Sequence, residues 1–399
     1  MIKSKVRFVD FKSLVLIIIL LIPSLIFKLF SKKIMIVSER RLEARDNGYW
    51  FFKFMREKHP KFKAFYVISR NSFDFKKVAC IGNVINFGSL KHYFYYLSCS
   101  IRASSHIDSD SPNSRVTNFL ERHHIIRNKF VFLQHGITKD KISFGYYSVT
   151  RARLFICSGL KEYSFCKEEF GYPQENVVLT GFARYDNLYS NQSTKRQILI
   201  MPTWRSWLSK TNESGFLSSD YYEKYQSLLN NQKLISLLEK YDYTLLFYPH
   251  YEMQKFIHLF SSASSSVIIA DQSKYDVQEL LKQSSLLITD YSSVAFDFCY
   301  MFKPVIYYQF DYSNYRKMQH PSGYFSYVED AFGPIEYNEN DVVDYIHLML
   351  QSSFNIEEIY KRRVNSFFAF FDNHNCERIY DEIVKVSTKK HFKQNGEKD

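Results

Sequence analysis

The stretch LLITDYSSVAFDFCYMFKPVIYY, residues 286–308, joins two apolar runs through a polar turn and a helix-like segment. Apolar runs without alternation are typical of strands that are buried on both faces of a parallel sheet. A strand, a helix and a second strand in this order form the βαβ unit from which parallel sheets are built. The stretch therefore predicts an α/β fold.

The turn inside this stretch is rich in polar side chains. Thr289, Asp290, Ser292 and Ser293 lie between the first apolar run and the start of the helix. One such residue is enough to cap a helix, and capping is the simplest role for any of them. Helix amino termini also leave free N–H groups and carry partial positive charge, so they bind phosphate. The surplus of polar groups favours a diphosphate-binding turn.

Similar apolar runs recur along the chain after residue 33. Amphipathic stretches at 220–241 and 274–284 separate some of them and supply crossover helices. The other predicted strands occupy residues 34–38, 64–69, 129–136, 153–158, 176–181, 197–204, 243–250, 266–271 and 304–310. The sequence thus predicts two doubly wound, Rossmann-like domains that face each other across a cleft.

A polar segment rich in structure-breaking residues, 184–197, separates the two predicted domains. We place the first domain at residues 34–190 and the second at residues 191–370. A last helical stretch, from about 356 to 389, is long enough to pack back across both. Residues 371–399 are expected to form this returning helix and a charged tail.

The first 33 residues contain the apolar stretch SLVLIIILLIPSLIFKLF at 13–30, which only Pro23 and Lys28 interrupt. Basic residues flank it on both sides, which suits a position at an anionic cytoplasmic leaflet. A membrane span needs about 20 mostly apolar residues, so a spanning and a half-inserted anchor both stay open. A buried core helix and a cleaved signal peptide are the alternatives, although no small-residue cleavage site follows. We predict that residues 1–33 form a membrane anchor.

The composition narrows the class of partner. The chain has 399 residues and a formal net charge of +12, which indicates an anionic partner such as a phosphorylated substrate or acidic lipid. The basic residues are scattered rather than clustered, so nucleic acid is not favoured. The six cysteines show no CxxC pair, which argues against a zinc site and a disulfide framework and fits a reducing compartment. The sequence contains no P-loop, GxGxxG or HExxH motif.

Two further motifs follow predicted strands, where ligands bind in open α/β sheets. In QHG, His135 is suited to act as a general base, and Gly136 lets a ligand approach the backbone closely. In MPTWR, Thr203 and Arg205 leave a strand, and an arginine there can pair with phosphate through two hydrogen bonds. The simpler alternatives are that His135 only holds a turn and that Arg205 lies on the surface.

The motif YPH closes another predicted strand with His250. Pro249 prevents the strand from continuing in the sheet, so His250 is expected at the sheet's edge. His135 and His250 would then face each other across the cleft from separate domains. One would deprotonate a hydroxyl while the other donates a hydrogen bond to phosphate oxygens.

Together these motifs resemble those of the CDP-glycerol glycerophosphotransferase family, the teichoic-acid and capsule polymerases and primases. The resemblance covers about Ile34 to Val384 and includes SERRLEARDNGYWFFKFMREKHP at 38–60 and QHGITKDK at 134–141. It implies a GT-B architecture, in which the first domain binds the acceptor and the second binds the donor.

The resemblance also implies a direct displacement at the β-phosphorus of a CDP-activated polyol, with CMP as the leaving group. His135 matches the family's base, and His250 matches its second histidine, which would contact or protonate the diphosphate. The implied substrate-binding residues are Gly136, Thr203, Arg205, Thr289, Asp290, Ser292, Ser293 and Arg378, and the acceptor-side candidates are Glu39, Arg45, Asp46 and Asn47.

Two departures from the family pattern affect the expected identity of the donor more than the expected type of reaction. The chain reads HGITKDK where many members read HGTPLK. From Asp372 to Ile379 it reads DNHNCERI where members commonly read DGKASERI, so Cys376 replaces a serine while Arg378 is retained. Glycerol phosphate and ribitol phosphate both stay open as the transferred group.

The resemblance predicts an enzyme at the cytoplasmic face of a bacterial cell membrane that transfers a polyol phosphate to a hydroxyl of a cell-wall or capsule glycopolymer. The acceptor would be lipid-linked or a glycan, and the sequence shows no requirement for a cofactor or metal. Metal dependence, oligomeric state and the choice between primase and polymerase stay open. The alternatives are a GT-B glycosyltransferase that uses a nucleotide sugar and a non-catalytic membrane-bound scaffold, while a nucleic-acid binder has only the net charge in its favour.

Overall fold

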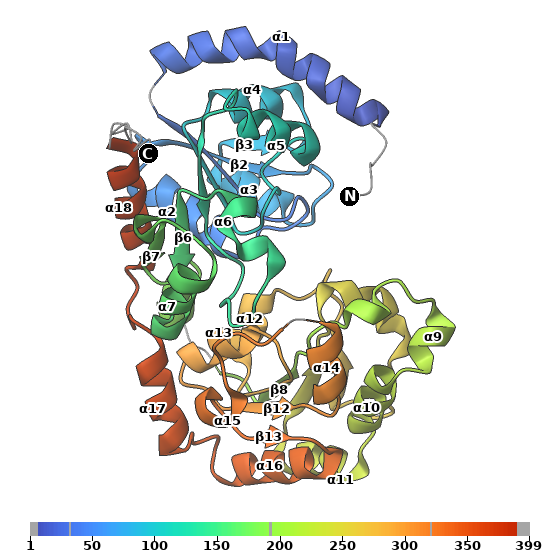
Figure 1. Cartoon of the computed structure of the whole chain (residues 1–399). Coiled ribbons are helices and arrows are strands. Elements are labelled where there is room, and N and C mark those ends of the chain that lie inside the picture. Colours follow the sequence, from blue (N-terminus) through green and yellow to red (C-terminus); the bar gives the residue numbers. More distant parts are fainter. Residues whose placement is uncertain (1–6, 32, 191–193, 320, 389–399) are drawn as a thin grey trace.

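The computed structural model describes residues 7–31, 33–190, 194–319 and 321–388 (Figure 1). Two parallel β-sheets with helices around them form the upper and lower halves of the molecule in this view. A long helix, α1 (Phe8–Phe30), runs across the outer side of the upper half. The prediction of an α/β fold with two parallel sheets is confirmed.

The first sheet has the strand order β3-β2-β1-β4-β5-β6-β7, and all its strands are parallel. Central strand β1 is buried along its whole length, since helices cover both faces of the sheet. The strands are β1 (Ile34–Ser38), β2 (Lys63–Ile68), β3 (Val84–Asn86), β4 (Ile101–Ser104), β5 (Lys129–Phe132), β6 (Leu154–Cys157) and β7 (Val177–Leu179). The helices are α2 (Asn47–Lys58), α3 (Phe75–Ile81), α4 (Leu90–Ser98), α5 (Ser114–Arg122), α6 (Tyr147–Thr150), α7 (Leu160–Glu169) and α8 (Tyr185–Ser190).

The second sheet has the order β10-β9-β8-β11-β12-β13 and is also parallel. Its strands are β8 (Gln197–Ile200), β9 (Thr244–Phe247), β10 (Val267–Ile269), β11 (Leu286–Thr289), β12 (Val305–Tyr308) and β13 (Ile335–Glu336). The helical segments are α9 (Glu213–Leu217), α10 (Asp220–Leu229), α11 (Gln232–Tyr241), the 3₁₀ segment η4 (Tyr251–Leu259), α12 (Val277–Gln283), α13 (Val294–Tyr300), α14 (Tyr312–Met318), α15 (Tyr327–Asp330), α16 (Glu339–Gln351), α17 (Glu358–Phe367) and α18 (Asn375–Thr388).

Several elements differ from the prediction. Strands β3, β4 and β13 are additional, and each is short. The predicted helix 220–241 is two helices, because the Asn231 side chain accepts the N–H of Leu234 and caps a new helix there. The predicted helix 356–389 is likewise two helices, α17 and α18, with residues 368–374 between them.

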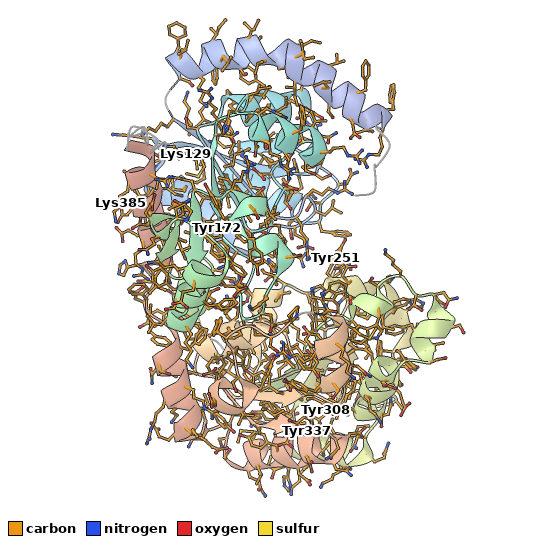
Figure 2. All side chains as sticks on the ribbon, viewed as in Figure 1. Lys129, Tyr172, Tyr251, Tyr308, Tyr337 and Lys385 are labelled. Atoms are coloured by element: carbon orange, nitrogen blue, oxygen red, sulfur yellow. The ribbon has the colours of Figure 1, made fainter. Side chains whose placement is uncertain are left out.

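The carboxy-terminal helix α18 packs on the first half rather than on the half that precedes it (Figure 1). The Cys376 N–H donates to Asp186 at 2.9 Å, and Lys129 Nζ donates to the Val386 carbonyl at 2.5 Å. Figure 2 shows Lys129 and Lys385 at this end of the molecule. The chain therefore crosses between the halves twice, before β8 and again between α17 and α18.

Helix α1 lies along α4 and α5. It is attached through apolar packing, in which Ile17 joins a cluster with Tyr93 and Tyr96, and through polar contacts. Ser13 Oγ lies 2.7 Å from the Tyr93 hydroxyl, and Lys28 Nζ donates to the Cys99 carbonyl at 3.1 Å. Only four of its residues are buried, namely Asp10, Ser13, Ile17 and Ser24. By its length and composition the helix could cross a membrane. It is therefore not a core helix of the first half.

Candidate active site

A cavity of about 330 Å³ lies where the two halves meet. Loops that follow β1, β2, β4, β5 and β7 line it from the first half, and loops that follow β8, β9, β10 and β11 line it from the second. These loops lie at the carboxyl ends of parallel strands, which is where open α/β sheets bind ligands. Figure 2 shows Tyr251, one of the lining residues, at the junction between the halves.

His135 reaches this cavity directly after β5, and its side chain is exposed there. The enclosing protein first, and then the guanidinium groups of Arg40 and Arg184, lower its pKa to about 4. A hydrogen bond to the Ser105 backbone acts in the opposite direction, so it is made by a ring N–H to the carbonyl. The other ring nitrogen of the neutral imidazole is then free to accept a proton.

His250 enters the same cavity from the second half, after β9. Its Nδ1 accepts the N–H of Glu252 at 3.2 Å, so Nε2 carries the hydrogen of the neutral ring. Burial, followed by the charges of Arg40 and His135, lowers the pKa of His250 to about 3. His250 is thus a neutral hydrogen-bond donor rather than a proton source before a ligand binds.

Ser292 and Ser293 line the cavity at the start of α13. Ser292 Oγ accepts the N–H of Val294 at 3.3 Å, which is a capping contact. Gly136 of the first half lies against Ser293, and a β-carbon on Gly136 would overlap the Ser293 hydroxyl. With any larger residue at position 136, the Ser293 side chain or the backbone would have to shift at this contact between the two halves.

The other residues of the turn are buried beneath the cavity. Asp290 Oδ1 accepts the N–H groups of Thr203 and Tyr291 at 2.8 and 2.6 Å. Thr289 Oγ1 donates to the Met201 carbonyl at 2.7 Å. Thr203, Thr289 and Asp290 are therefore buried, outside the cavity lining, and support the turn; their contact with the ligand stays a prediction.

Arg205 also fails to reach the cavity. Its side chain is 0% exposed and pairs with Asp290 at 2.9 Å and with Asp311 at 2.7 Å. Pairing with a phosphate would require a buried guanidinium to leave two carboxylates unpaired, which is strongly unfavourable. In this structure Arg205 connects the turn to the loop before α14, and its contact with phosphate stays a prediction.

Arg378 lies outside the cavity, on α18. Its guanidinium pairs with Asp372 at 2.8 Å and donates to the Thr180 carbonyl at 2.8 Å. Cys376, at the position of the family's serine, is buried with its sulfur 3.5 Å from the Ala183 carbonyl. Both residues attach α18 to the first half, and substrate binding by Arg378 stays a prediction.

Of the acceptor-side candidates, Arg45 and Asp46 line the cavity, whereas Glu39 and Asn47 do not. The Glu39 carboxyl group accepts the N–H groups of Arg45, Asp46 and Tyr49 at 2.6–2.8 Å. Burial and, next, the charge of Asp46 raise the pKa of Glu39 to about 8. Asn47 donates to the Gln134 carbonyl at 2.7 Å, next to His135. Glu39 and Asn47 thus hold the loops that carry the cavity residues.

Three residues of this cavity, Arg40, His106 and Arg184, are not among the sequence candidates. Arg184 pairs with Asp46 at 2.6 Å and with Asp297 of α13 at 2.7 Å, so it links the two halves. Its motif, GFARYD, follows a predicted strand, and that position was the signal that could have identified it. His106 follows β4, a strand that was not predicted.

Each arginine of the cavity is paired with a carboxylate: Arg40 with Glu43 at 3.6 Å, Arg45 with Asp74 at 2.8 Å, and Arg184 with Asp46 and Asp297. Arg40 and Arg45 keep further guanidinium N–H groups with which an anionic ligand could pair.

Metal ligation has no candidate in the part of the chain that the structure describes. No group of three or more histidine, cysteine, aspartate or glutamate side chains there is arranged to hold a metal ion. The six cysteines are all free.

Comparison with known proteins places the chain in a family. The family profile of CDP-Glycerol:Poly(glycerophosphate) glycerophosphotransferase matches residues 21–385. The minor teichoic acid biosynthesis protein GgaB of Bacillus subtilis is 34% identical over 377 residues, which cover 92% of this chain and 41% of GgaB. The teichoic acid poly(ribitol-phosphate) polymerase of Bacillus spizizenii W23 is 28% identical over 54% of this chain and 35% of its own length. The chain thus spans less than half the length of these relatives.

The fold has a counterpart among solved structures. The structure of the wall teichoic acid polymerase TagF superposes with a TM-score of 0.67 at 17% identity and covers 96% of this chain and 99% of that one. This similarity confirms the predicted GT-B architecture. The family match over most of its length shows that the chain belongs to the CDP-glycerol:poly(glycerophosphate) glycerophosphotransferase family.

Proposed function

We propose that this protein transfers a polyol phosphate from a CDP-activated donor to a hydroxyl of a cell-wall or capsule glycopolymer and releases CMP. The observation that carries the proposal is the meeting of His135 and His250 on one cavity, with opposite hydrogen-bonding roles. Membership of the family supports the CDP donor. Relatives named as ribitol-phosphate and glycerol-phosphate polymerases support a polyol phosphate as the transferred group.

In the proposed reaction the acceptor hydroxyl attacks the β-phosphorus of the donor. A new oxygen–phosphorus bond forms while the bond from the β-phosphorus to the bridging oxygen breaks, and CMP leaves with that electron pair. His135 takes the hydroxyl proton on its free ring nitrogen. His250 donates from Nε2 to a diphosphate oxygen, where charge accumulates as CMP leaves.

The donor diphosphate is proposed to lie at Ser292 and Ser293. Both residues line the cavity. The first N–H groups of α13 already donate within the turn, from Val294 to Ser292 Oγ and from Ala295 and Phe296 to the carbonyls of Ser292 and Ser293, so the serine hydroxyls are the donors proposed for the phosphates. Arg40, which lines the same cavity beside Tyr251, adds positive charge on the opposite wall. These groups would hold the phosphates in line with the acceptor hydroxyl at His135.

Helix α1 is proposed to lie in the plane of the cytoplasmic membrane surface, where a lipid-linked acceptor would be presented. Its attachment to α4 and α5 through Ser13 and Lys28 would have to break before it could span a bilayer. The face turned away from the protein exposes the apolar residues Phe8, Val9, Phe11, Ile18, Ile19, Ile22, Ile26, Leu29 and Phe30. Apolar surface of this extent on one side of a helix suits insertion into the interfacial layer.

The test is CMP release by the purified protein given CDP-glycerol or CDP-ribitol separately, with a membrane or lipid-linked acceptor. We expect release from one of the two donors and loss of release in His135→Ala. As a control, His258→Ala changes an exposed histidine outside the cavity and is expected to leave release unchanged. Release from neither donor, together with release of the nucleotide from a nucleotide sugar, would instead establish a glycosyltransferase.

A further inference from the structure

The ring of His106 stacks directly on that of His135. The ring centroids are 4.7 Å apart and the planes meet at 15°. The backbone beneath His106 is held at the end of β4, because Ser104 Oγ accepts the His106 N–H at 3.2 Å and donates to its carbonyl at 2.7 Å. Ser105 is held as well, since its hydroxyl accepts the N–H of Gly48 at 2.8 Å. The backbone that carries His106 is thus held in place, and the His106 ring lies against that of His135.

His106 differs from a histidine that serves the fold. Buried His92 has partners for both ring nitrogens: Nδ1 accepts the Gly88 N–H at 3.0 Å, and Nε2 lies 2.9 Å from the Asp110 carbonyl. His106 Nδ1 is buried and has no hydrogen-bond partner within the described residues. Buried polar atoms are rarely left unpaired unless the site has a function. Within the described residues, the His106 ring is therefore not held by a hydrogen bond at Nδ1.

The charges around the two rings keep both neutral. Arg40 and Arg184 face both rings, and His250 faces them from the second half. Asp46 and Asp297 are nearby, but both pair with Arg184. Burial and then the charges of His135, Arg40, Arg184 and His250 lower the pKa of His106 well below its ordinary range. Because each protonated ring would repel the other, the pair holds no more than one proton.

We propose that His106 is a positioning residue for His135: its stacked ring fixes the plane of the His135 imidazole and stabilises the imidazolium that forms when His135 accepts the proton of the acceptor hydroxyl. The inference rests on the transfer reaction proposed above. A neutral aromatic face attracts a cation placed over it, so the stacking contact becomes stronger as the proton arrives. An interaction that strengthens along the reaction raises kcat, whereas an equal interaction with bound substrate would alter KM.

The test compares two replacements of similar size. His106→Phe keeps a flat aromatic ring against His135, and His106→Leu fills the space without one. We expect the phenylalanine variant to retain kcat within about twofold, and the leucine variant to lose roughly tenfold or more. The dissociation constant of the CDP-polyol, measured by calorimetry, should be unchanged in both variants. Equal kcat losses in the two variants, or no loss in either, would overturn the proposal.

A second measurement asks whether the effect passes through His135. In a His135→Asn background, His106→Leu should cause no further loss of the residual rate, because the ring that it positions is gone. A further loss equal to that in the wild-type background would show a structural role and would overturn the proposal. Failure of the proposed function is distinguishable, since the wild-type protein itself would then release no CMP from either CDP-polyol.

Discussion

Gly136 in the first half and Ser293 in the second lie so close that no β-carbon fits between them. This contact sits between His135, the proposed base, in one half and the turn proposed to bind phosphate in the other. Gly136→Ala should therefore displace the turn from His135 while leaving each sheet intact. Because a shift of about 1 Å at a reacting centre lowers rates by about 100-fold, we expect kcat to fall by roughly 10- to 100-fold.

The measurement is kcat for CMP release, with circular dichroism to check that the fold is retained. Ser293→Ala removes the hydroxyl that the new methyl would meet, so it serves as the matched partner. The double variant should lose less activity than the product of the two single losses, as expected for residues in contact. If the fold-loss in kcat of the double variant equalled the product of the two single losses, the proposed contact between position 136 and Ser293 would be contradicted.

Replacement of Arg205 should damage stability rather than donor binding alone. Arg205→Met leaves the buried carboxylates of Asp290 and Asp311 without their cation, and removal of one partner of a buried ion pair costs about 3–5 kcal/mol. Urea denaturation would measure the loss in the free energy of unfolding. Arg196→Met is the control, because its pair with Asp242 is exposed and should contribute little. Equal stability of the two variants would contradict the buried ion-pair assignment.

Variants on the two sides of the cavity should affect donor binding and phosphate transfer separately. His135→Ala should abolish transfer while CDP-polyol binding stays largely intact. Combined Ser292→Ala and Ser293→Ala should instead weaken donor binding by about 1–3 kcal/mol, through the loss of hydrogen bonds to charged phosphate oxygens. Calorimetry with the donor and turnover assays would distinguish the two effects. Identical defects in both variants would refute the separate roles.

As the pH is lowered, kcat/KM should begin to fall only well below the ordinary pKa of histidine. His135 acts as a base only when neutral, and its pKa is lowered from 6.5 to about 4. Activity should thus persist as the pH falls through 6.5 and decline only towards 4. A decline in kcat/KM near pH 6.5 would show that the pKa of the base is not lowered.

The lowered pKa of His135 preserves activity at acidic pH, but it reduces the stability of the folded state there. Below pH 6.5 the unfolded chain binds protons that His135 and His250 in the folded state do not, so stability falls as the pH falls towards 4. Fluorescence or circular dichroism at each pH would define the window in which the rate profile reports only catalysis.

Helix α1 should determine membrane attachment without affecting chemistry. Ile18→Glu combined with Ile22→Glu places charge on its exposed face, where these side chains are 63% and 66% exposed. We expect loss of co-sedimentation with phosphatidylglycerol vesicles, and unchanged CMP release with a soluble acceptor. Val328→Glu is the matched control, since Val328 is 79% exposed on α15. Vesicle binding equal to that of the wild type would argue against α1 as the attachment site.

Most strands were predictable because their apolar runs are uninterrupted. Strand β4 was not, because Arg102 and Ser104 interrupt its pattern. The structure shows why they are tolerated: Arg102 pairs with Asp110 at 2.7 Å and with Glu121 at 3.1 Å, and Ser104 accepts a hydrogen bond from Ser38. Such pairings are made across the fold, so a local pattern cannot show them.

The site was predictable to the extent that it lies on strand ends. His135, His250, Ser292 and Ser293 share one cavity, as their positions after strands indicated. Arg205 also follows a strand but points away, because Asp311, 106 residues later, is its partner. Whether a polar side chain faces a ligand or another part of the protein depends on such distant partners. The catalytic roles themselves stay predictions.

The two chain crossings, at the segment before β8 and at residues 368–374, have a mechanical consequence. A single connection would let one half swivel in any direction relative to the other. With two connections, the simplest movement between the halves is a hinge rotation about the axis that passes through both connecting segments. Any widening of the cavity would then follow one path, which returns Gly136 to Ser293 in the same register each time it closes. Cutting the chain between α17 and α18 would remove the second connection. It should impair the closing movement that brings Gly136 against Ser293, while every cavity residue is retained.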